Sequence, residues 1–250
     1  QLLLPAVALC LAWQPVRAEL PSLGGQYSGT LTASEERQMG EKFLRQARAQ
    51  LQFLSDYEVE GFIRHMGRRI VAQTQFRAYS FQFHVVADPQ LNAFAVPGGH
   101  IFVHTGLIQT AESADELAGV LAHEVAHITQ RHIARRMAAG KRTQLSSLLL
   151  VAAGVLAGAQ GEGEAAQALV MSAGAYSQDR MLAYSRDHER EADRLGLRYL
   201  TAAGYDPDAL ASFLGKLQDW SRLQGRSPAP FLSTHPLTGN RIADARARAD

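Results

Sequence analysis

The sequence has one cysteine, an almost balanced charge and no apolar run of bilayer-spanning length. The single Cys10 excludes an internal disulfide and a metal site built from several thiolates. Lys and Arg number 25 against 24 Asp and Glu, without a basic stripe interleaved with aromatic residues, which argues against a nucleic-acid partner. Residues 145–159 are almost wholly apolar or small, but they fall short of the roughly 20 residues that a spanning helix needs. We interpret them as a core-packing helix, with peripheral contact to a membrane or a client protein as the alternative.

Residues 1–18 have the pattern of a secretory signal peptide, with an apolar region over Leu2–Trp13 and small residues at Val16 and Ala18. The segment has no initiating Met and no basic start, so we expect the sequence to begin inside the signal peptide. Cleavage after Ala18 would remove the only cysteine and lower the formal net charge from +1 to zero. We therefore expect export to the periplasm, a linker over 19–33 and a single domain over 34–250.

Residues 123–127 spell His-Glu-x-x-His in a stretch that the sequence pattern predicts to be a helix. His123 and His127, four residues apart, share one helical face and can bind one metal ion, while Glu124 can serve as a general base. Ser113 and Glu116 match a capping box at the start of this helix. Apolar residues at helical spacing and small residues around the motif predict that the two imidazoles point into protein, where zinc would satisfy them. The apolar positions are Leu117, Val120, Leu121, Val125 and Ile128.

A catalytic zinc of this type needs a third protein ligand and an open fourth position. The best candidate is Glu189, which lies four residues before Asp193 on a predicted helical face that also carries Gly196. Asp193 is expected to accept a hydrogen bond from the outer nitrogen of a ligand histidine. His188 is the rival ligand. The other charged residues of the segment are interpreted as a solvated face: Arg190, Glu191 and Arg194.

Four blocks of the sequence, taken together, resemble the HtpX and CAAX-prenyl-protease family of zinc metallopeptidases, and most closely its periplasmic branch, the beta-barrel assembly-enhancing proteases. They are residues 92–99, 123–132, 189–196 and 234–237 followed by Arg241. The resemblance covers about residues 34–250. It implies an α+β fold, a mainly helical zincin-like metallopeptidase with a small β-sheet or hairpin beside the active-site helix.

The resemblance also implies a site with one Zn²⁺ per chain. The implied ligands are His123, His127 and Glu189, with Glu124 as general base. Asp193 takes a supporting or proton-handling catalytic role.

A predicted strand over 79–87 precedes a predicted hairpin, in which 92–96 and 100–105 flank the turn Pro97-Gly98-Gly99. We expect Asn92, Ala93 and Phe94 to contribute to a substrate cleft, because an edge strand beside the metal can hold a peptide in extended form. The alternative is a hairpin that only packs the sheet. Helices are expected over 32–51, 56–74 and 242–249, and another is expected to begin at Asp206-Pro207.

His235 lies before Pro236 and after a proline-rich stretch, so we expect it in a non-helical loop. There it would either occupy the fourth metal position and block water, or stabilise the oxyanion during turnover. An exposed loop histidine without a partner is the alternative. Arg241 is expected to reach the oxyanion or an acidic partner. His132 recurs in the family pattern but has no ligand spacing with His123 or His127. The remaining histidines are interpreted as structural: His65, His84, His100 and His104.

Three functional hypotheses follow. The first is a periplasmic zinc endopeptidase that hydrolyses unfolded, stalled or misassembled outer-membrane proteins, with His235 as an autoinhibitory switch. The second is a mainly non-catalytic chaperone or assembly factor for outer-membrane proteins, working with the assembly machinery and carrying a latent zinc site. The third is a structural-zinc binding module, which the absence of a Cys-rich ligand set disfavours. The outer-membrane client class rests on the family resemblance alone.

Overall fold

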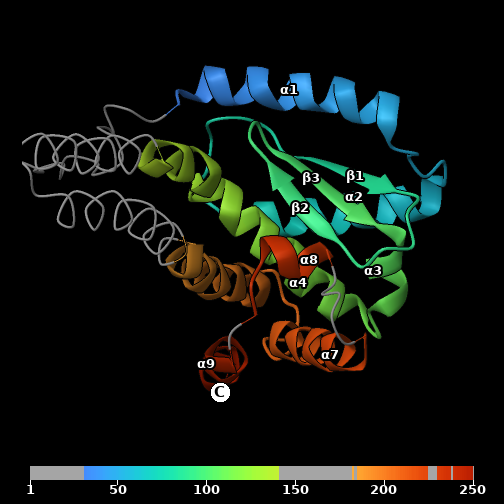
Figure 1. Ribbon diagram of the computed structural model, residues 1–250, viewed down its shortest axis with the longest axis vertical. Coiled ribbons are helices and arrows are strands. Elements are labelled where there is room, and N and C mark those ends of the chain that lie inside the picture. Colours follow the sequence, from blue (N-terminus) through green and yellow to red (C-terminus); the bar gives the residue numbers. More distant parts are fainter. Residues whose placement is uncertain (1–30, 141–181, 183–184, 225–229, 238, 250) are drawn as a thin grey trace, which may run out of the picture.

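The computed structural model describes residues 31–140, 182, 185–224, 230–237 and 239–249. Its described part is a mainly helical α+β fold around one three-stranded sheet, which confirms the predicted fold class (Figure 1). The predicted signal peptide and the apolar segment 145–159 lie outside the described residues. Among the helices that are described, none is long and apolar enough to cross a bilayer.

The sheet has the strand order β1-β3-β2. Strand β1 (Gln82–Val86) runs parallel to β3 (His100–His104), and β2 (Ala93–Val96) pairs antiparallel with β3, which confirms the predicted hairpin. Gly98 and Gly99 close the turn with φ of 86° and 93°, a backbone region that side chains with a Cβ rarely adopt. Within the described sheet, β2 pairs with β3 alone, so β2 is an edge strand.

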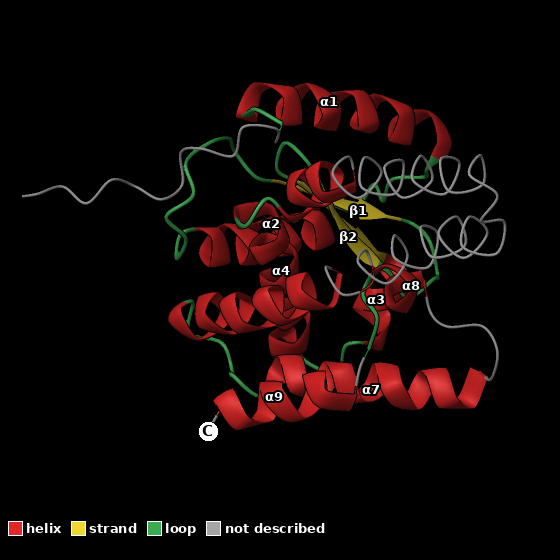
Figure 2. Ribbon diagram, turned by 60° about the vertical axis from the view of Figure 1, so that its left-hand side comes forward, coloured by secondary structure: helices red, strands yellow, loops and turns green. Residues whose placement is uncertain are grey.

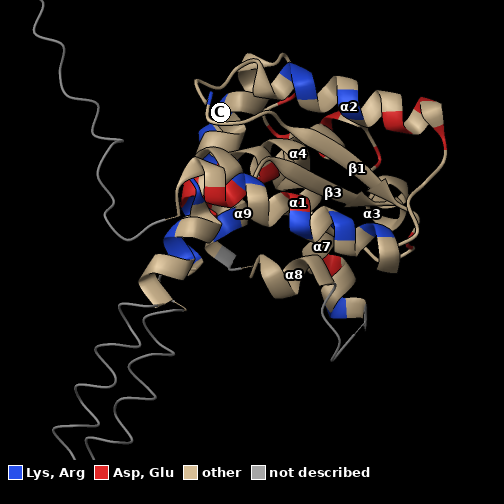
Figure 3. Ribbon diagram, turned by 90° about the horizontal axis from the view of Figure 1, so that it is seen from above, with Lys and Arg blue, Asp and Glu red and all other residues tan. Residues whose placement is uncertain are grey.

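Alternate residues of β3 face two separate layers. Ile101 and Val103 belong to the main core, whereas Phe102 packs with Leu44 and Ala47 of α1 (Ala33–Gln50) in a second cluster. The side chains of β3 alternate between the two faces of the sheet, as the strand period of two requires. Helix α1 covers one face, and α2 (Tyr57–Val71) and α4 (Ala114–Thr129) cover the other, as Figure 2 shows. Both signs of charge occur on the outward-facing helices α1 and α2 (Figure 3).

The helix starts follow from local capping. The Thr32 hydroxyl accepts the Glu35 amide in a full capping box, and Asp56 caps α2 through the amides of Glu58 and Val59. Ser113 caps α4 as predicted, but the return bond differs: the Glu116 carboxylate accepts the amide of Glu112. It also accepts the hydroxyl of Ser212 and the ammonium of Lys216, both on α7 (Ala209–Gln224), and so links α4 to α7.

The C-terminal part departs from prediction at two boundaries. The Asp206 carboxylate accepts the Asp208 amide, as an N-cap does, but a turn over 207–208 follows, so α7 begins at Ala209 and not at Pro207. The stretch before His235, expected to be a loop, contains the short helix α8 (Pro230–Thr234), whereas His235 itself is non-helical as predicted; α9 (Gly239–Ala249) follows. The other helical parts are 132–140, 185–202 and the short α3 (Thr105–Thr110).

His84 of β1 makes stability depend on pH. It stacks on Phe102, with ring centroids 4.7 Å apart, in the layer beneath α1. Burial, together with the neighbouring His100 and Arg48, lowers its pKa from 6.5 to about 4. The folded protein therefore keeps this ring neutral at pH values where the unfolded chain protonates it. The resulting stability is present above about pH 6.5 and is lost as the pH falls towards 4.

We predict that the free energy of unfolding falls less steeply in His84→Phe than in the parent as the pH is lowered from about 7 to about 4, because the protonation linkage is gone. Urea denaturation over this range measures the difference. His65→Phe, at an exposed position of α2, should keep the parent's slope. Equal slopes for His84→Phe and the parent would contradict the prediction.

Candidate metal centre

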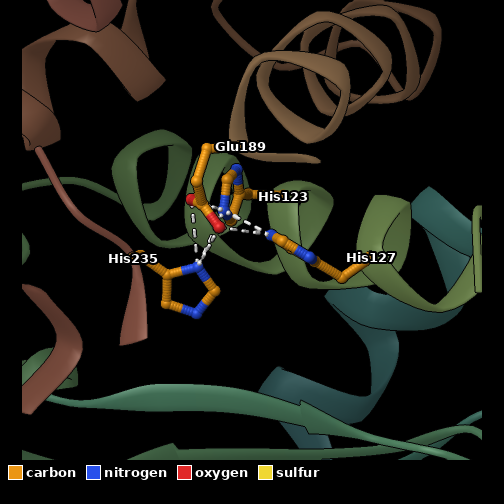
Figure 4. Close-up of side chains that lie close together, drawn as sticks. All are labelled: His123, His127, Glu189 and His235. Atoms are coloured by element: carbon orange, nitrogen blue, oxygen red, sulfur yellow. Dashed lines mark hydrogen bonds and ion pairs between the residues drawn. The ribbon is translucent and has the colours of Figure 1, made fainter. Parts of the chain in front are cut away.

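Four buried side chains converge at the middle of the molecule: His123, His127, Glu189 and His235 (Figure 4). Each offers one donor atom, and these four atoms lie within 4.8 Å of one another. The group contains the three predicted zinc ligands and the predicted fourth-position residue. The rival ligand His188 is outside this group; its ring instead stacks on His132, with centroids 4.1 Å apart.

Helix α4 and the helical segment 185–202 supply three of the four donors. They cross where Gly196 meets the α4 backbone: a Cβ at this position would lie 3.0 Å from the amide nitrogen of His123. The predicted close approach at Gly196 is therefore present. It brings Glu189, two turns earlier in the segment, against the histidine face of α4.

The distances among the donors are those of a zinc site, except that His123 and His127 stand closer together. His123 Nε2 lies 2.9 Å from His127 Nε2, 3.3 Å from Glu189 Oε2 and 3.3 Å from His235 Nδ1. His127 Nε2 lies 3.5 Å from Glu189 Oε1. In a tetrahedral zinc site with bonds of about 2.0–2.2 Å, neighbouring donors are roughly 3.3–3.6 Å apart. A donor set of imidazoles and one carboxylate is also the set that zinc prefers.

The outer nitrogen of His123 faces a second carboxylate. His123 Nδ1 lies 2.9 Å from Asp193 Oδ1, in the place predicted for Asp193. Arg241 donates to both oxygens of Asp193, at 2.7 and 2.8 Å, and its Nη1 lies 3.0 Å from Glu189 Oε2. Of the two partners expected for Arg241, the structure thus shows the acidic one. These contacts orient His123 so that Nε2 presents its lone pair to the centre.

The electrostatics of the cluster call for a cation. Burial raises the pKa of Glu124 and lowers that of His127 well below its usual value. Burial also raises the pKa of Glu189, but His235, His123 and His127 outweigh it and hold that pKa well below its usual value. For His123, burial lowers the pKa, yet Asp193 and Glu189 raise it to about 9. The carboxylates of Asp193 and Glu189 thus favour positive charge at the centre, which a divalent ion would supply.

His235 is buried, not exposed, which excludes the reading of an unpartnered loop histidine. The ring stacks on Phe231 of α8, with centroids 4.6 Å apart, and the His235 amide donates to the Phe231 carbonyl. Its Nδ1 points at the metal cluster, while Nε2 lies 3.3 Å from Glu124 Oε1. The ring thus stands between the predicted general base and the predicted zinc ligands.

A cavity of about 410 Å³ opens beside the cluster. Phe94 lines it, followed by Ala95, Val96 and Pro97 along β2. The predicted cleft residues Asn92 and Ala93 do not line it, so the exposed part of the edge strand begins two residues later than expected. The opposite walls come from α1 through Met39 and Phe43, from the helical segment 132–140 through His132, Ile133 and Arg136, and from the segment 185–202 through Ser185 and His188.

Sequence reasoning missed two residues at this centre. The spacing of His132 predicts no ligand role and Glu191 is predicted to be solvated, yet His132 Nδ1 lies 2.9 Å from His127 Nδ1, and its Nε2 lies 3.0 Å from Glu191 Oε2. A helical wheel does not predict the contact between His127 and His132, because residues five apart point in different directions on a continuous helix. No signal in the sequence marks the break in the helix that creates it. His84, His100 and His104 belong to the sheet and lie outside the cluster.

Comparison with known proteins agrees with this site. The chain belongs to peptidase family M48, whose family model matches residues 58–249. A metallopeptidase family and a buried His-His-Glu-His group both fit one zinc ion per chain.

Curated relatives include the beta-barrel assembly-enhancing protease of Yersinia pestis, 36% identical over 243 residues, and that of Escherichia coli K12, 35% identical over 238 residues. These alignments cover 94% and 92% of this chain but 48% and 47% of the relatives. The mitochondrial metalloendopeptidase OMA1 of Schizosaccharomyces pombe is 32% identical over 181 residues, which are 72% of this chain and 50% of that protein. The chain therefore spans about half the length of the curated relatives it matches.

The helix crossing at Gly196 gives a direct test of how the cluster is held. Gly196→Val would push the segment 185–202 away from α4 at His123. We predict a loss of about 1–3 kcal/mol in the free energy of unfolding and at least tenfold weaker zinc binding, measured by denaturation and by chelator competition.

The matched control is Gly61→Val on α2, where an added Cβ meets no atom within 4 Å. Because Val has a slightly higher helix propensity than Gly, this variant should be at least as stable as the parent and bind zinc like it. Unchanged zinc affinity in Gly196→Val would show that the crossing does not set the cluster's geometry.

Proposed function

We propose that the chain is a zinc-dependent endopeptidase that is held in a latent state by His235. The observation that supports this most strongly is the contact of one buried glutamate with the metal cluster. Glu124 is 0% exposed, follows ligand candidate His123 in the chain, and has its carboxylate beside the ring that occupies the fourth donor position. A closed structural zinc site would have no use for a carboxylate at this place.

The proposed zinc ligands are His123, His127 and Glu189. Bound zinc would polarise the scissile carbonyl and lower the pKa of a nearby water. Glu124 would accept the proton of that water at its carboxylate and pass it to the leaving amine nitrogen. Burial raises the pKa of Glu124, which suits a base that must hold the proton between these two transfers. Asp193 and Arg241 would keep His123 oriented throughout.

The substrate would lie along the edge strand β2. The backbone of 94–97 borders the cavity, and an extended peptide can pair with such an edge through main-chain hydrogen bonds. Pairing of this kind selects unfolded or unassembled segments with little demand on sequence. The aromatic and apolar walls at Met39, Phe43 and Phe94 favour large apolar side chains near the scissile bond.

The names of the relatives support a proposal about substrates and location. Proteins named for enhancing beta-barrel assembly align with nearly the whole chain, so we propose that the substrates are unfolded or misassembled outer-membrane proteins. We propose a periplasmic location for the same reason, with a signal peptide over 1–18 cleaved after Ala18 and the peptidase domain over 34–250. Contact with the assembly machinery, and membrane contact through 145–159, belong to the same proposal.

One observation favours a second function. His235 takes the fourth donor position, so zinc held by these four donors would have no position open to water, as expected of a mainly non-catalytic chaperone or assembly factor. The two proposed functions predict different outcomes when the His235 ring is removed: the latent peptidase should gain proteolytic activity, and the assembly factor should not.

Two substitutions test the peptidase, with cleavage of casein and bound zinc as the measurements. We predict that Glu124→Gln keeps one zinc per chain and loses activity by at least about 10²-fold, because no base remains. Glu60→Gln, at an exposed ion pair with Arg64 on α2, should cleave like the parent. Cleavage by Glu124→Gln at the parent rate would refute the mechanism.

His235→Ala should cleave casein faster than the parent, because the ring no longer fills the fourth position. His65→Ala is the control for loss of an imidazole at an exposed site. If His235→Ala loses activity instead, the ring assists turnover and the latent state is wrong. Zinc binding with no cleavage by either protein would favour the assembly factor.

A further inference from the structure

The helix that carries the His-Glu-x-x-His motif breaks immediately after it. Helix α4 ends at Thr129, and Arg131 has a φ of 54°, a left-handed conformation that is uncommon for a residue with a Cβ. Its guanidinium holds this turn in place: Arg131 Nε donates to Glu36 Oε1 of α1 at 3.1 Å, and Tyr79 donates to the other oxygen of the same carboxylate. The break turns the next residue, His132, back towards the metal cluster.

His132 joins a line of four side chains that ends on a proposed zinc ligand. His127 Nδ1 and His132 Nδ1 are 2.9 Å apart, His132 Nε2 is 3.0 Å from Glu191 Oε2, and Arg135 Nη1 donates to the same oxygen at 2.7 Å. His132 is 2% exposed, and its ring stacks on His188 with an angle of 13° between the planes. His132 is therefore packed in the interior, while the side chains of Glu191 and Arg135, 26% and 29% exposed, lie where the line reaches the surface.

Hydrogen-bond chemistry allows one arrangement of protons along this line when both rings are neutral. An ionised carboxylate only accepts, so His132 must donate from Nε2 to Glu191. The Nδ1 of His132 then carries a lone pair and accepts from Nδ1 of His127. The proton of His127 is thereby fixed on Nδ1, and its Nε2 is left free to bind a metal.

The same helical segment supplies a comparable support to the other histidine. Asp193, backed by Arg241, faces Nδ1 of His123, and Glu191, backed by Arg135, reaches Nδ1 of His127 through His132. The two carboxylates stand two and four residues after Glu189. One segment thus provides a ligand and the outer support for both histidines.

We propose that His132 and Glu191 are positioning residues, which fix the tautomer and ring orientation of His127 for zinc binding. This inference rests on the zinc site of the proposed function. Loss of such an outer partner costs 10–100-fold in metal affinity in comparable sites. The proposal assigns His132 no contact with substrate and no step in catalysis.

The test is the zinc affinity of purified protein, measured by competition with a chromophoric chelator in the absence of substrate. His132→Phe keeps the ring volume and removes the acceptor, so it should bind zinc 10–100-fold more weakly than the parent. His132→Asn places its Oδ1 where Nδ1 stood, so it should recover part of that loss. His84→Phe, the same change in a half-buried histidine of the sheet, should bind like the parent.

A double-mutant cycle tests whether the residues act in series. Glu191→Gln should weaken zinc binding in the parent and have little further effect in His132→Phe, where no ring nitrogen remains for it to orient. Thermal melting of each zinc-free variant verifies that it is folded. If His132→Phe is not folded, His132→Asn and Glu191→Gln carry the test.

Parent-like zinc affinity in a folded His132→Phe would overturn the proposal, as would equal weakening by Phe and Asn or fully additive losses in the cycle. These outcomes would not contradict the proposed peptidase activity. A parent that binds no zinc at all would instead refute the proposed function, together with the inference that rests on it.

Discussion

The structure depends on one helix crossing, in which the segment 185–202 lies against α4 at Gly196. The crossing sets the carboxylates of Glu189 and Asp193 against the two imidazoles of the motif, all in the protein interior. Buried carboxylates are stable only where positive charge or hydrogen-bond donors face them. Arg241 meets part of that demand, and the remainder falls on a metal ion at the centre. The sheet and α7 hold α4 from its other sides and so keep the crossing in place.

Much of this arrangement follows from local sequence patterns. The capping residues Thr32, Asp56 and Ser113 predict where three helices begin, and Pro97-Gly98-Gly99 predicts the hairpin, because these signals act within a few residues. The pair of His123 and His127 is predictable because a helical period of 3.6 places residues four apart on one face. The choice of Glu189 over His188 rests on its spacing to Asp193 and on the family resemblance. Helical periodicity cannot predict where a helix breaks. The left-handed Arg131 depends on a contact with Glu36, 95 residues away, so the role of His132 becomes visible only in three dimensions.

The position of His235 likewise cannot be predicted from local sequence patterns. Proline-rich flanks correctly indicate a break in regular structure, but they do not predict that α8 would carry the ring onto Phe231 and into the fourth donor position. We propose that the centre has two states, which differ by the position of this one ring. With His235 in place, the cluster is a closed four-donor site; with the ring displaced, Glu124 would face an open metal position beside the edge of β2. A protease that acts on unfolded chains benefits from such control, because main-chain pairing at an edge strand discriminates poorly between substrates.

The central claim is that one zinc ion is held by His123, His127 and Glu189, with His235 as the fourth donor. Zinc K-edge X-ray absorption on the purified chain tests it most directly, with elemental analysis to count the metal. The account predicts one zinc per chain in a four-coordinate shell of three imidazole nitrogens and carboxylate oxygen at about 2.0–2.2 Å. In His235→Ala, the multiple-scattering signal of one imidazole should be lost and a single oxygen should take its place. An absence of zinc, or a parent shell with fewer than three imidazoles, would contradict the account.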